Sequence, residues 1–170
     1  MSRMNTFTLR AARPDDVPAL VGLIGELAAF ENLTHLMQVS PQTLAPYLFG
    51  PRPVAEAWVA EVGEGTDAKL VALALCFTNF STFLGKPGLY LEDLYVQPAH
   101  RNAGIGRALL QHLAGVAVAR DYGRFEWCVL DWNVNAQRFY ERLGATLLNE
   151  WRLCRVTGDA LRQLGQGAGA

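Results

Sequence analysis

Residues 89–110 read LYLEDLYVQPAHRNAGIGRALL and combine the features of an anion-binding loop. An apolar strand pattern runs into a turn that holds Gly104 and Gly106, and an amphipathic helix follows. Free N–H groups at such a helix start, together with the helix dipole, favour a negatively charged ligand. Arg101 and Arg107 add positive charge on either side of the glycines. We therefore expect a pyrophosphate here, with the plain start of a helix as the alternative.

Two familiar phosphate loops do not fit this segment. A dinucleotide fingerprint needs a third glycine where the chain has Leu109, and a P-loop needs a Gly-Lys-Ser/Thr ending that is missing from the sequence. What remains is Arg101-x-x-Gly104-x-Gly106. This pattern resembles the acyl-CoA loop of the GNAT superfamily of N-acetyltransferases.

Glu92 and Asp93 are adjacent acids inside a strand pattern that is otherwise apolar. Because strand residues alternate between faces, we expect one acid on each face of the sheet. Burying a carboxylate is costly unless it is paired or has a function. Ion-paired core acids are one interpretation. In the functional one, Glu92 attracts a substrate ammonium and accepts its proton, directly or through water. Asp93 then holds the substrate's positive charge or positions neighbouring groups.

Acetyl transfer to an amine also needs donors for the oxyanion and an acid for the departing thiolate. Backbone N–H groups near 94–96 are candidate oxyanion donors if the sheet splays there. Tyr140 is a candidate acid, because a phenol with a pKa of about 10 can protonate a thiolate whose conjugate acid has a pKa of about 8.5. The residue pattern alone favours a half-buried core tyrosine. Asn133 and Asn135 either cap the helix that contains Tyr140 or reach the cofactor.

Composition narrows the class of protein. The chain has 170 residues, 51% hydrophobic and 18% charged, which is typical of one globular domain. The net charge is −1 and the 15 basic residues are dispersed, so nucleic acid is not an expected partner. The longest apolar runs are too short for a membrane span, and MSRMNTFTLR does not resemble a signal peptide, so we expect a cytoplasmic protein. Cys76, Cys128 and Cys154 are expected to be packed free thiols.

The hydrophobic periodicity predicts an α+β fold, a mixed central sheet flanked by helices. Expected strands are Phe7–Ala11, Ala55–Val62, Lys69–Phe80, Leu89–Val96, Phe125–Asp131 and a final strand region at Ala145–Val156. Expected helices follow Asp16, start at Ser40-Pro41 (weakened by Pro46), begin near Ile105, and span Asn135–Leu143. The glycine-rich ending GQGAGA is expected to fray.

Four blocks strengthen the resemblance because they agree with one branch of the superfamily in order and spacing. They are GELAAFE at 25–31, GLYLEDLYV at 88–96, RNAGIGRALL at 101–110 and DWNVNAQRFYERLGA at 131–145. On these blocks the chain looks like a diamine N-acetyltransferase of the spermidine, spermine and thialysine type. The resemblance implies a single-domain GNAT fold over 1–170, with a core of about 5–157 and a tail at 158–170. It also implies acetyl-CoA as co-substrate, no metal and a homodimer.

The resemblance further assigns site residues. It implies that Tyr140 is the proton donor and that Glu92 is a catalytic, substrate-binding acid. The cofactor would be bound by Leu94, Tyr95, Val96, Arg101, Asn102, Ala103, Gly104, Ile105, Gly106, Arg107, Asn133, Val134, Asn135, Ala136 and Tyr140. The amine would be bound by Phe30, Glu31, Glu92, Asp93, Glu126, Trp127, Cys128 and Glu150.

One departure bears on the acceptor. Polyamine-specialised members have an aspartate in the loop after the second long strand, where this chain has Asn79-Phe80-Ser81-Thr82. Fewer acids suit a short diamine or a lysine-like amino acid at least as well as a long polyamine. Other amine acceptors, such as a protein N-terminus, an aminoglycoside or another metabolite, are alternatives. A non-catalytic CoA-binding sensor is a further alternative.

Overall fold

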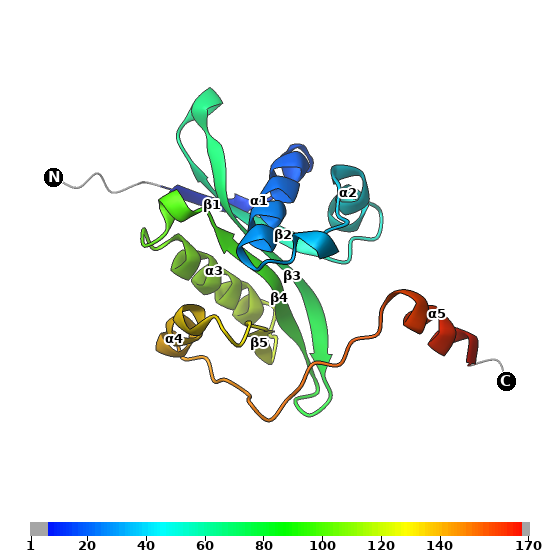
Figure 1. The fold of residues 1–170 in the computed structure, drawn as a ribbon. Helices are drawn as coiled ribbons and strands as arrows, with labels where there is room; N and C mark the ends of the chain where they lie inside the picture. Colours follow the sequence, from blue (N-terminus) through cyan, green and yellow to red (C-terminus); the bar gives the residue numbers. More distant parts are fainter. Residues whose placement is uncertain (1–6, 168–170) are drawn as a thin grey trace. The chain divides into compact units, whose positions relative to one another are not determined.

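A computed structural model describes residues 7–167, which form two compact units divided between Cys128 and Val129 (Figure 1). The first unit has one five-stranded sheet in the order β1-β2-β3-β4-β5. Its strands are β1 (Phe7–Ala11), β2 (Glu56–Val62), β3 (Lys69–Ser81), β4 (Lys86–Val96) and β5 (Arg124–Trp127). Its helices are α1 (Val17–Phe30), α2 (Pro41–Phe49) and α3 (Ile105–Ala119). Neighbouring strands are antiparallel except β4 and β5, which are parallel, so the predicted mixed sheet is confirmed.

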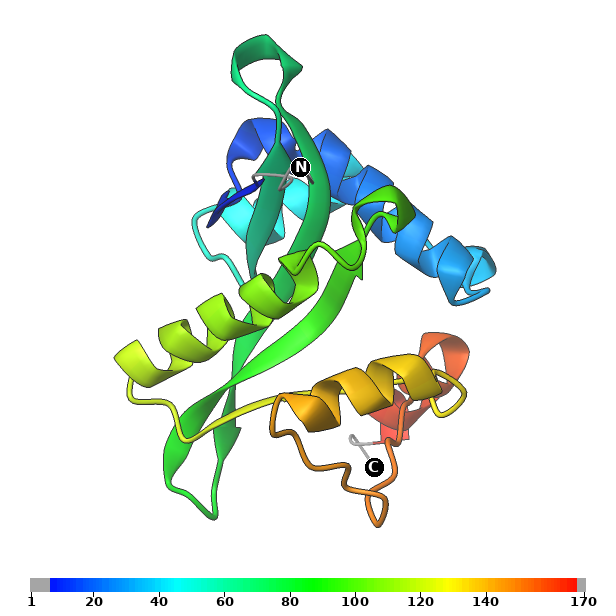
Figure 2. The same cartoon turned by 90° about the vertical axis from the view of Figure 1, so that its left-hand side faces the viewer.

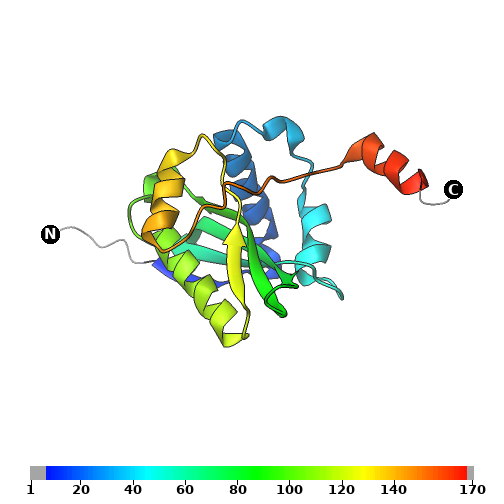
Figure 3. The same ribbon diagram turned by 90° about the horizontal axis from the view of Figure 1, so that it is seen from below.

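The first unit has three layers. Figure 3 shows α1 and α2 on one face of its sheet and α3 on the other. The core of the α1 face is formed by Leu20, Leu23, Leu48, Ala57, Val59, Leu73, Leu75 and Tyr95. On the other face, the ring of Trp58 in β2 contacts the ring of His112 in α3, with centroids 4.1 Å apart. The two sets of strand residues alternate, as expected for a sheet buried on both faces.

Local sequence explains where these helices begin. Ser40 caps α2, since its side chain accepts a hydrogen bond from the Thr43 N–H, and Pro41 occupies the first turn, where its missing N–H costs nothing. Pro46 lies inside α2 as predicted, and the helix ends at Phe49. In α1 the side chains of Val17, Leu20 and Leu23 are buried.

The long hairpin of β3 and β4 has one irregularity that shapes the site. Figure 2 shows this hairpin as a twisted ribbon, and β4 begins at Lys86, earlier than predicted. In its register Leu75 faces Asp93 but Cys76 faces Leu91, so Glu92 is an extra residue, a β-bulge. The bulge interrupts the strict alternation of side chains at Glu92. The prediction that Glu92 and Asp93 point to opposite faces is based on that alternation and therefore loses its basis.

The second unit contains α4 (Val134–Arg142) and α5 (Gly158–Gln166). Gly144 follows α4 with a φ of 95°, a left-handed conformation that commonly ends a helix. The predicted strand at Ala145–Val156 is wrong, because these residues form no strand. The backbone hydrogen bonds donated from this segment are local, from Ala145 to Tyr140 and from Trp151 to Leu148, whereas a strand requires a neighbouring strand.

Two further expectations are corrected. The strand expected at Phe125–Asp131 ends at Trp127. Within the segment predicted to be a tail, Gly158–Gln166 form α5, and its role as a tail stays a prediction. Of the three cysteines, Cys76 is buried as expected, whereas Cys128 and Cys154 are exposed. Residues 1–6, part of the segment compared with signal peptides, and 168–170 lie outside the described residues. Within 7–167, no helix is both long and apolar enough to cross a membrane.

Candidate active site

The site is built around the open edge of β4. β5 pairs with β4 only from Gly88 to Leu91, so beyond Leu91 the edge of β4 away from β3 has no paired strand in residues 7–167. The N–H of Gln97 donates to Val71 on β3, and directions alternate along an antiparallel pair. The N–H groups of Leu94 and Val96 therefore point to the open edge. The edge of β4 that the predicted oxyanion site needs is thus unpaired where β5 ends at Trp127, and the oxyanion role of these N–H groups stays a prediction.

Tyr95 differs from its two neighbours. It pairs with Leu73, and the same alternation directs its backbone N–H toward β3. Its side chain is buried in the core on the α1 face. Of the three residues predicted to bind the cofactor through main chain, the two at 94 and 96 thus have the suitable direction.

The loop before α3 has the geometry of an anion site. Gly104 adopts a φ of 83° and Asn102 a φ of 62°, both in the left-handed region. The first backbone bond of α3 is donated by Ala108 to Gly104, which leaves the N–H groups of residues 105–107 directed out of the helix start. A Cβ at Gly104 would meet nothing within 4 Å, so the loop surface is open. These features fit the pyrophosphate of a CoA-type co-substrate.

Arg101 contacts both a residue predicted to bind the cofactor, Val96, and a residue predicted to bind the amine, Phe30. Its Nε donates a 2.9 Å hydrogen bond to the carbonyl oxygen of Val96, at the open edge of β4. Its guanidinium lies 5.1 Å from the ring centre of Phe30, at the end of α1, and 5.6 Å from that of Tyr95. Such cation–π contacts restrain an arginine side chain that is otherwise exposed.

Three carboxylates, Glu31, Glu92 and Asp93, make up what we call the acidic group. Burial, then the charge of Glu92, then that of Glu31 raise the pKa of Asp93 to about 6. Burial also raises the pKa of Glu31. Glu92, the bulged residue, is exposed. A group of acids whose charges oppose one another is relieved by a bound cation, and a substrate ammonium is such a cation.

The neighbouring strand β5 adds a second cluster. Glu126 accepts a 2.7 Å hydrogen bond from Asn79 Nδ2 and forms a 3.1 Å ion pair with Arg124, so its charge is already compensated. The hydroxyl of Tyr90 donates to the Cys128 sulfur at 3.1 Å. Burial first, then Cys128, Glu92 and Glu126 raise the pKa of this tyrosine.

Sequence reasoning missed part of this cluster. It named Glu126, Trp127 and Cys128 but not Tyr90 or Arg124, and it noted Asn79 only as a departure from the family pattern. Trp127 is half-buried, and its ring lies 5.0 Å from that of Phe125. The register that pairs Tyr90 with Glu126 brings these residues together, and a single sequence does not contain that register.

The remaining predicted residues belong to the second unit. Asn133 caps α4, since its Oδ1 accepts a 3.3 Å bond from the Ala136 N–H, which confirms the capping interpretation. Tyr140 lies on α4, half-buried, with its ring 5.4 Å from that of Phe139. Val134, Asn135 and Glu150 are exposed. The convergence of Tyr140 with Glu92 on one thioester stays a prediction.

This fold and loop correspond to a known class of enzyme. The Acetyltransferase (GNAT) family matches residues 26–145, and the chain belongs to this family. It is therefore an N-acetyltransferase, and membership implies acetyl-CoA as co-substrate. The predicted α+β GNAT fold is confirmed.

Individual relatives agree with this assignment. The chain is 34% identical to an L-ornithine N5-acetyltransferase of Arabidopsis thaliana, over 92% of this chain and 86% of the plant protein. It is 36% identical to the thialysine N-epsilon-acetyltransferase of Mus musculus, over 95% of this chain and 98% of the mouse protein. Among solved structures, an integron cassette protein from the mobile metagenome of V. cholerae is similar with a TM-score of 0.76 and 27% identity. That match covers 94% of this chain and 98% of the cassette protein.

Proposed function

We propose that this enzyme transfers the acetyl group of acetyl-CoA to a primary amine of a short diamine or of a basic amino acid such as ornithine or thialysine. The observation that supports this acceptor is the acidic group of Glu31, Glu92 and Asp93, which adjoins the open edge of β4. An acceptor with two ammonium groups can place one near these carboxylates while the other reacts. The names of the plant and mouse relatives are consistent with this choice.

The compensation of Glu126 favours a short acceptor over a long polyamine. Because Arg124 and Asn79 already bind this carboxylate, β5 offers little unpaired negative charge for an additional ammonium. A polyamine with three or four charges would need acids spread along its length. The acidic group alone suits one or two charges.

Each step of the transfer can be assigned to residues of this chain. Acetyl-CoA supplies the acetyl group activated as a thioester. Glu92 attracts the ammonium and accepts its proton, directly or through water, so that the neutral amine can attack. The N–H groups of Leu94 and Val96 stabilise the negative charge that develops on the carbonyl oxygen. The C–S bond of the tetrahedral intermediate then breaks and Tyr140 donates its proton to the departing thiolate. The second proton, lost by the attacking nitrogen, returns Tyr140 to its neutral form.

Thiol release in the presence of acetyl-CoA tests this proposal directly. Rates are compared for putrescine, spermidine, ornithine, lysine and thialysine, and we expect the short acceptors to give the highest kcat/KM. Glu31→Gln should raise KM for these acceptors roughly tenfold, as expected for one lost charge-assisted contact. Glu64→Gln, a change at an exposed acid in the turn after β2, is the matched control. No turnover with any of the five amines, in protein that binds acetyl-CoA, contradicts the proposed acceptor class.

We also propose that residues 1–170 act as one acetyltransferase domain in a cytoplasmic homodimer. The family match from 26 to 145 includes residues of both compact units, which supports one domain. Light scattering during size-exclusion chromatography measures the mass in solution. A value near 18.7 kDa, the mass of one chain, contradicts the homodimer.

A further inference from the structure

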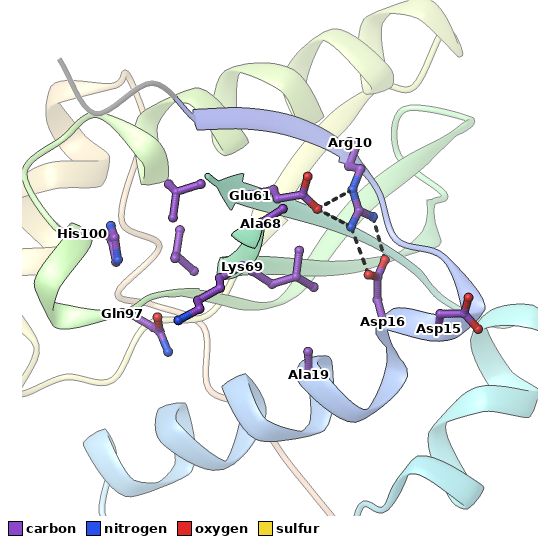
Figure 4. Close-up of a pocket in the computed structure, with 12 residues that line it drawn as sticks. Arg10, Asp15, Asp16, Ala19, Glu61, Ala68, Lys69, Gln97 and His100 are labelled. Carbon is purple, nitrogen blue, oxygen red and sulfur yellow. Dashed lines mark hydrogen bonds and ion pairs between the residues drawn. The ribbon is translucent and has the colours of Figure 1, made fainter. Parts of the chain in front are cut away.

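A cavity of about 650 Å³ lies between the first half of α1 and the strands β1 to β3, and the turn at 97–100 closes one end (Figure 4). Its volume is in the range of small-molecule sites. α1 reaches the cavity at Ala19, whereas Glu31 of the acidic group is twelve residues further on, roughly 18 Å along the helix axis. The mechanism described above uses none of the residues that line this cavity.

One end of the cavity is acidic. Arg10 of β1 donates to both oxygens of Asp16, at 2.7 and 3.0 Å, and to Oε2 of Glu61, at 2.7 and 3.2 Å (Figure 4). This network has one cation and two carboxylates, so its formal charge is −1. The exposed carboxylate of Asp15 also lines the cavity and has no ion-pair partner in the described residues. The second oxygen of Glu61, Oε1, is likewise left without a bond among residues 7–167.

The other end is a donor end. Lys69, at the start of β3, extends toward Gln97, and its ammonium has no ion-pair partner in the part of the chain that the structure describes (Figure 4). His100 lines the same end, and its Nδ1 is buried without a hydrogen-bond partner. Buried polar atoms normally have a hydrogen-bond partner, so this unpaired nitrogen leaves one polar atom of a cavity-lining residue unsatisfied. Gln97 is fixed by a 2.9 Å bond from its Nε2 to Glu26.

Between the two ends, the wall is formed by short aliphatic side chains. Ala19, Ala68 and Val71 are among the residues that line it. The cavity thus has donors and a cation at one end, an apolar wall in the middle and carboxylates at the other end. A ligand with one charge satisfies only one of these ends, whereas a zwitterion satisfies both.

We propose that this cavity is a second small-molecule site, which binds an aminocarboxylic acid in its zwitterionic form. The ligand's carboxylate accepts hydrogen bonds from Lys69 and His100, and its ammonium pairs with the free oxygen of Glu61. The cavity adjoins the loop that begins at Arg101, because His100 is the residue directly before it. The proposal does not depend on the acceptor proposed above, since no residue of the acidic group contributes to the cavity.

The probe is 4-aminobutyrate, added to 15N-labelled full-length enzyme without acetyl-CoA and followed by heteronuclear NMR. We expect saturable shifts at residues 68–71 and 97–100. Butyrate and butylamine have the same chain and one charge each, and we expect both to bind at least roughly tenfold more weakly. Equal binding of butyrate overturns the zwitterion assignment. The absence of shifts at these residues, or their loss when CoA saturates the enzyme, overturns a separate site.

Matched variants localise the binding. Lys69→Met and Glu61→Gln should each weaken 4-aminobutyrate roughly ten- to a hundredfold, the usual effect of losing a charge-assisted bond. Lys86→Met and Glu64→Gln, at a lysine paired with Asp121 and at an exposed acid, should leave the affinity unchanged. His100→Gln, which breaks no ion pair, replaces Glu61→Gln if that variant does not fold. Equal losses in target and control variants refute the cavity as the binding site.

Discussion

The negative charge of Glu31, at the end of α1, acts on the carboxyl group of Asp93 in β4. It is the third cause, after burial and the charge of Glu92, that raises the pKa of Asp93 to about 6. A helix end and a bulged strand thus hold like charges together, and within residues 7–167 neither carboxylate forms an ion pair with a basic side chain. Such an arrangement is costly for the empty protein and favourable for a cation that enters it.

This arrangement makes the stability of the protein depend on Asp93 and pH. Because the pKa is higher in the folded state than the ordinary value of 3.8, the protonated form favours folding at low pH. That stabilisation is lost as pH rises from about 4 to 6. The corresponding loss in the free energy of unfolding is at most roughly 3 kcal/mol. Asp93→Asn removes the charge. The unfolding temperature of the variant minus that of the wild type should therefore increase from pH 4 to pH 7.

Thermal unfolding of both proteins across this pH range measures the difference. Asp67→Asn, at an exposed acid in the turn between β2 and β3, is the matched control and should show no such trend. The same pH trend in both variants would show that the effect does not arise at Asp93.

Tyr140 is predicted to protonate the departing thiolate, and Tyr140→Phe removes only its hydroxyl. We expect kcat to fall roughly 10²–10⁴-fold, the range for loss of a general acid. The affinity for acetyl-CoA should change little. Tyr47→Phe, on the exposed side of α2 with 57% of its surface accessible, should keep wild-type kcat. Steady-state rates of thiol release give both values, and an unchanged kcat in the Tyr140 variant would exclude it from the mechanism.

Gly104 is needed for its backbone conformation rather than for lack of space. Its φ of 83° is unfavourable for other residues, while a Cβ there would meet nothing within 4 Å. Gly104→Val should therefore distort the loop and weaken acetyl-CoA binding in calorimetry by roughly tenfold or more. Gly115→Ala, at an open helical position of α3 with ordinary φ, should bind normally and gain up to about 1 kcal/mol of stability. Wild-type affinity in the Gly104 variant would refute the loop assignment.

Local patterns predicted most of this fold, and the failures have a common physical cause. The caps at Ser40 and Asn133 depend on residues three positions away, and both were identifiable in the sequence. The bulge at Glu92 and the pairing of Tyr90 with Glu126 depend on the register between strands that are distant in the sequence. The apolar pattern at 145–156 is compatible with a strand, but a strand also requires a neighbouring strand, and a pattern does not identify one.

The three cysteines should react in the order set by their surroundings. Burial, together with the charge of Glu56, raises the pKa of the Cys76 thiol to about 12, whereas Cys128 and Cys154 are exposed. Because the thiolate is the reactive form, native protein treated with iodoacetamide at neutral pH should be alkylated at 128 and 154 but not at 76. Peptide mass spectrometry measures each site, and unfolded protein, in which all three react, is the control. Alkylation of Cys76 in the native state at the rate of the other two would contradict the burial of β3 between α1 and α3.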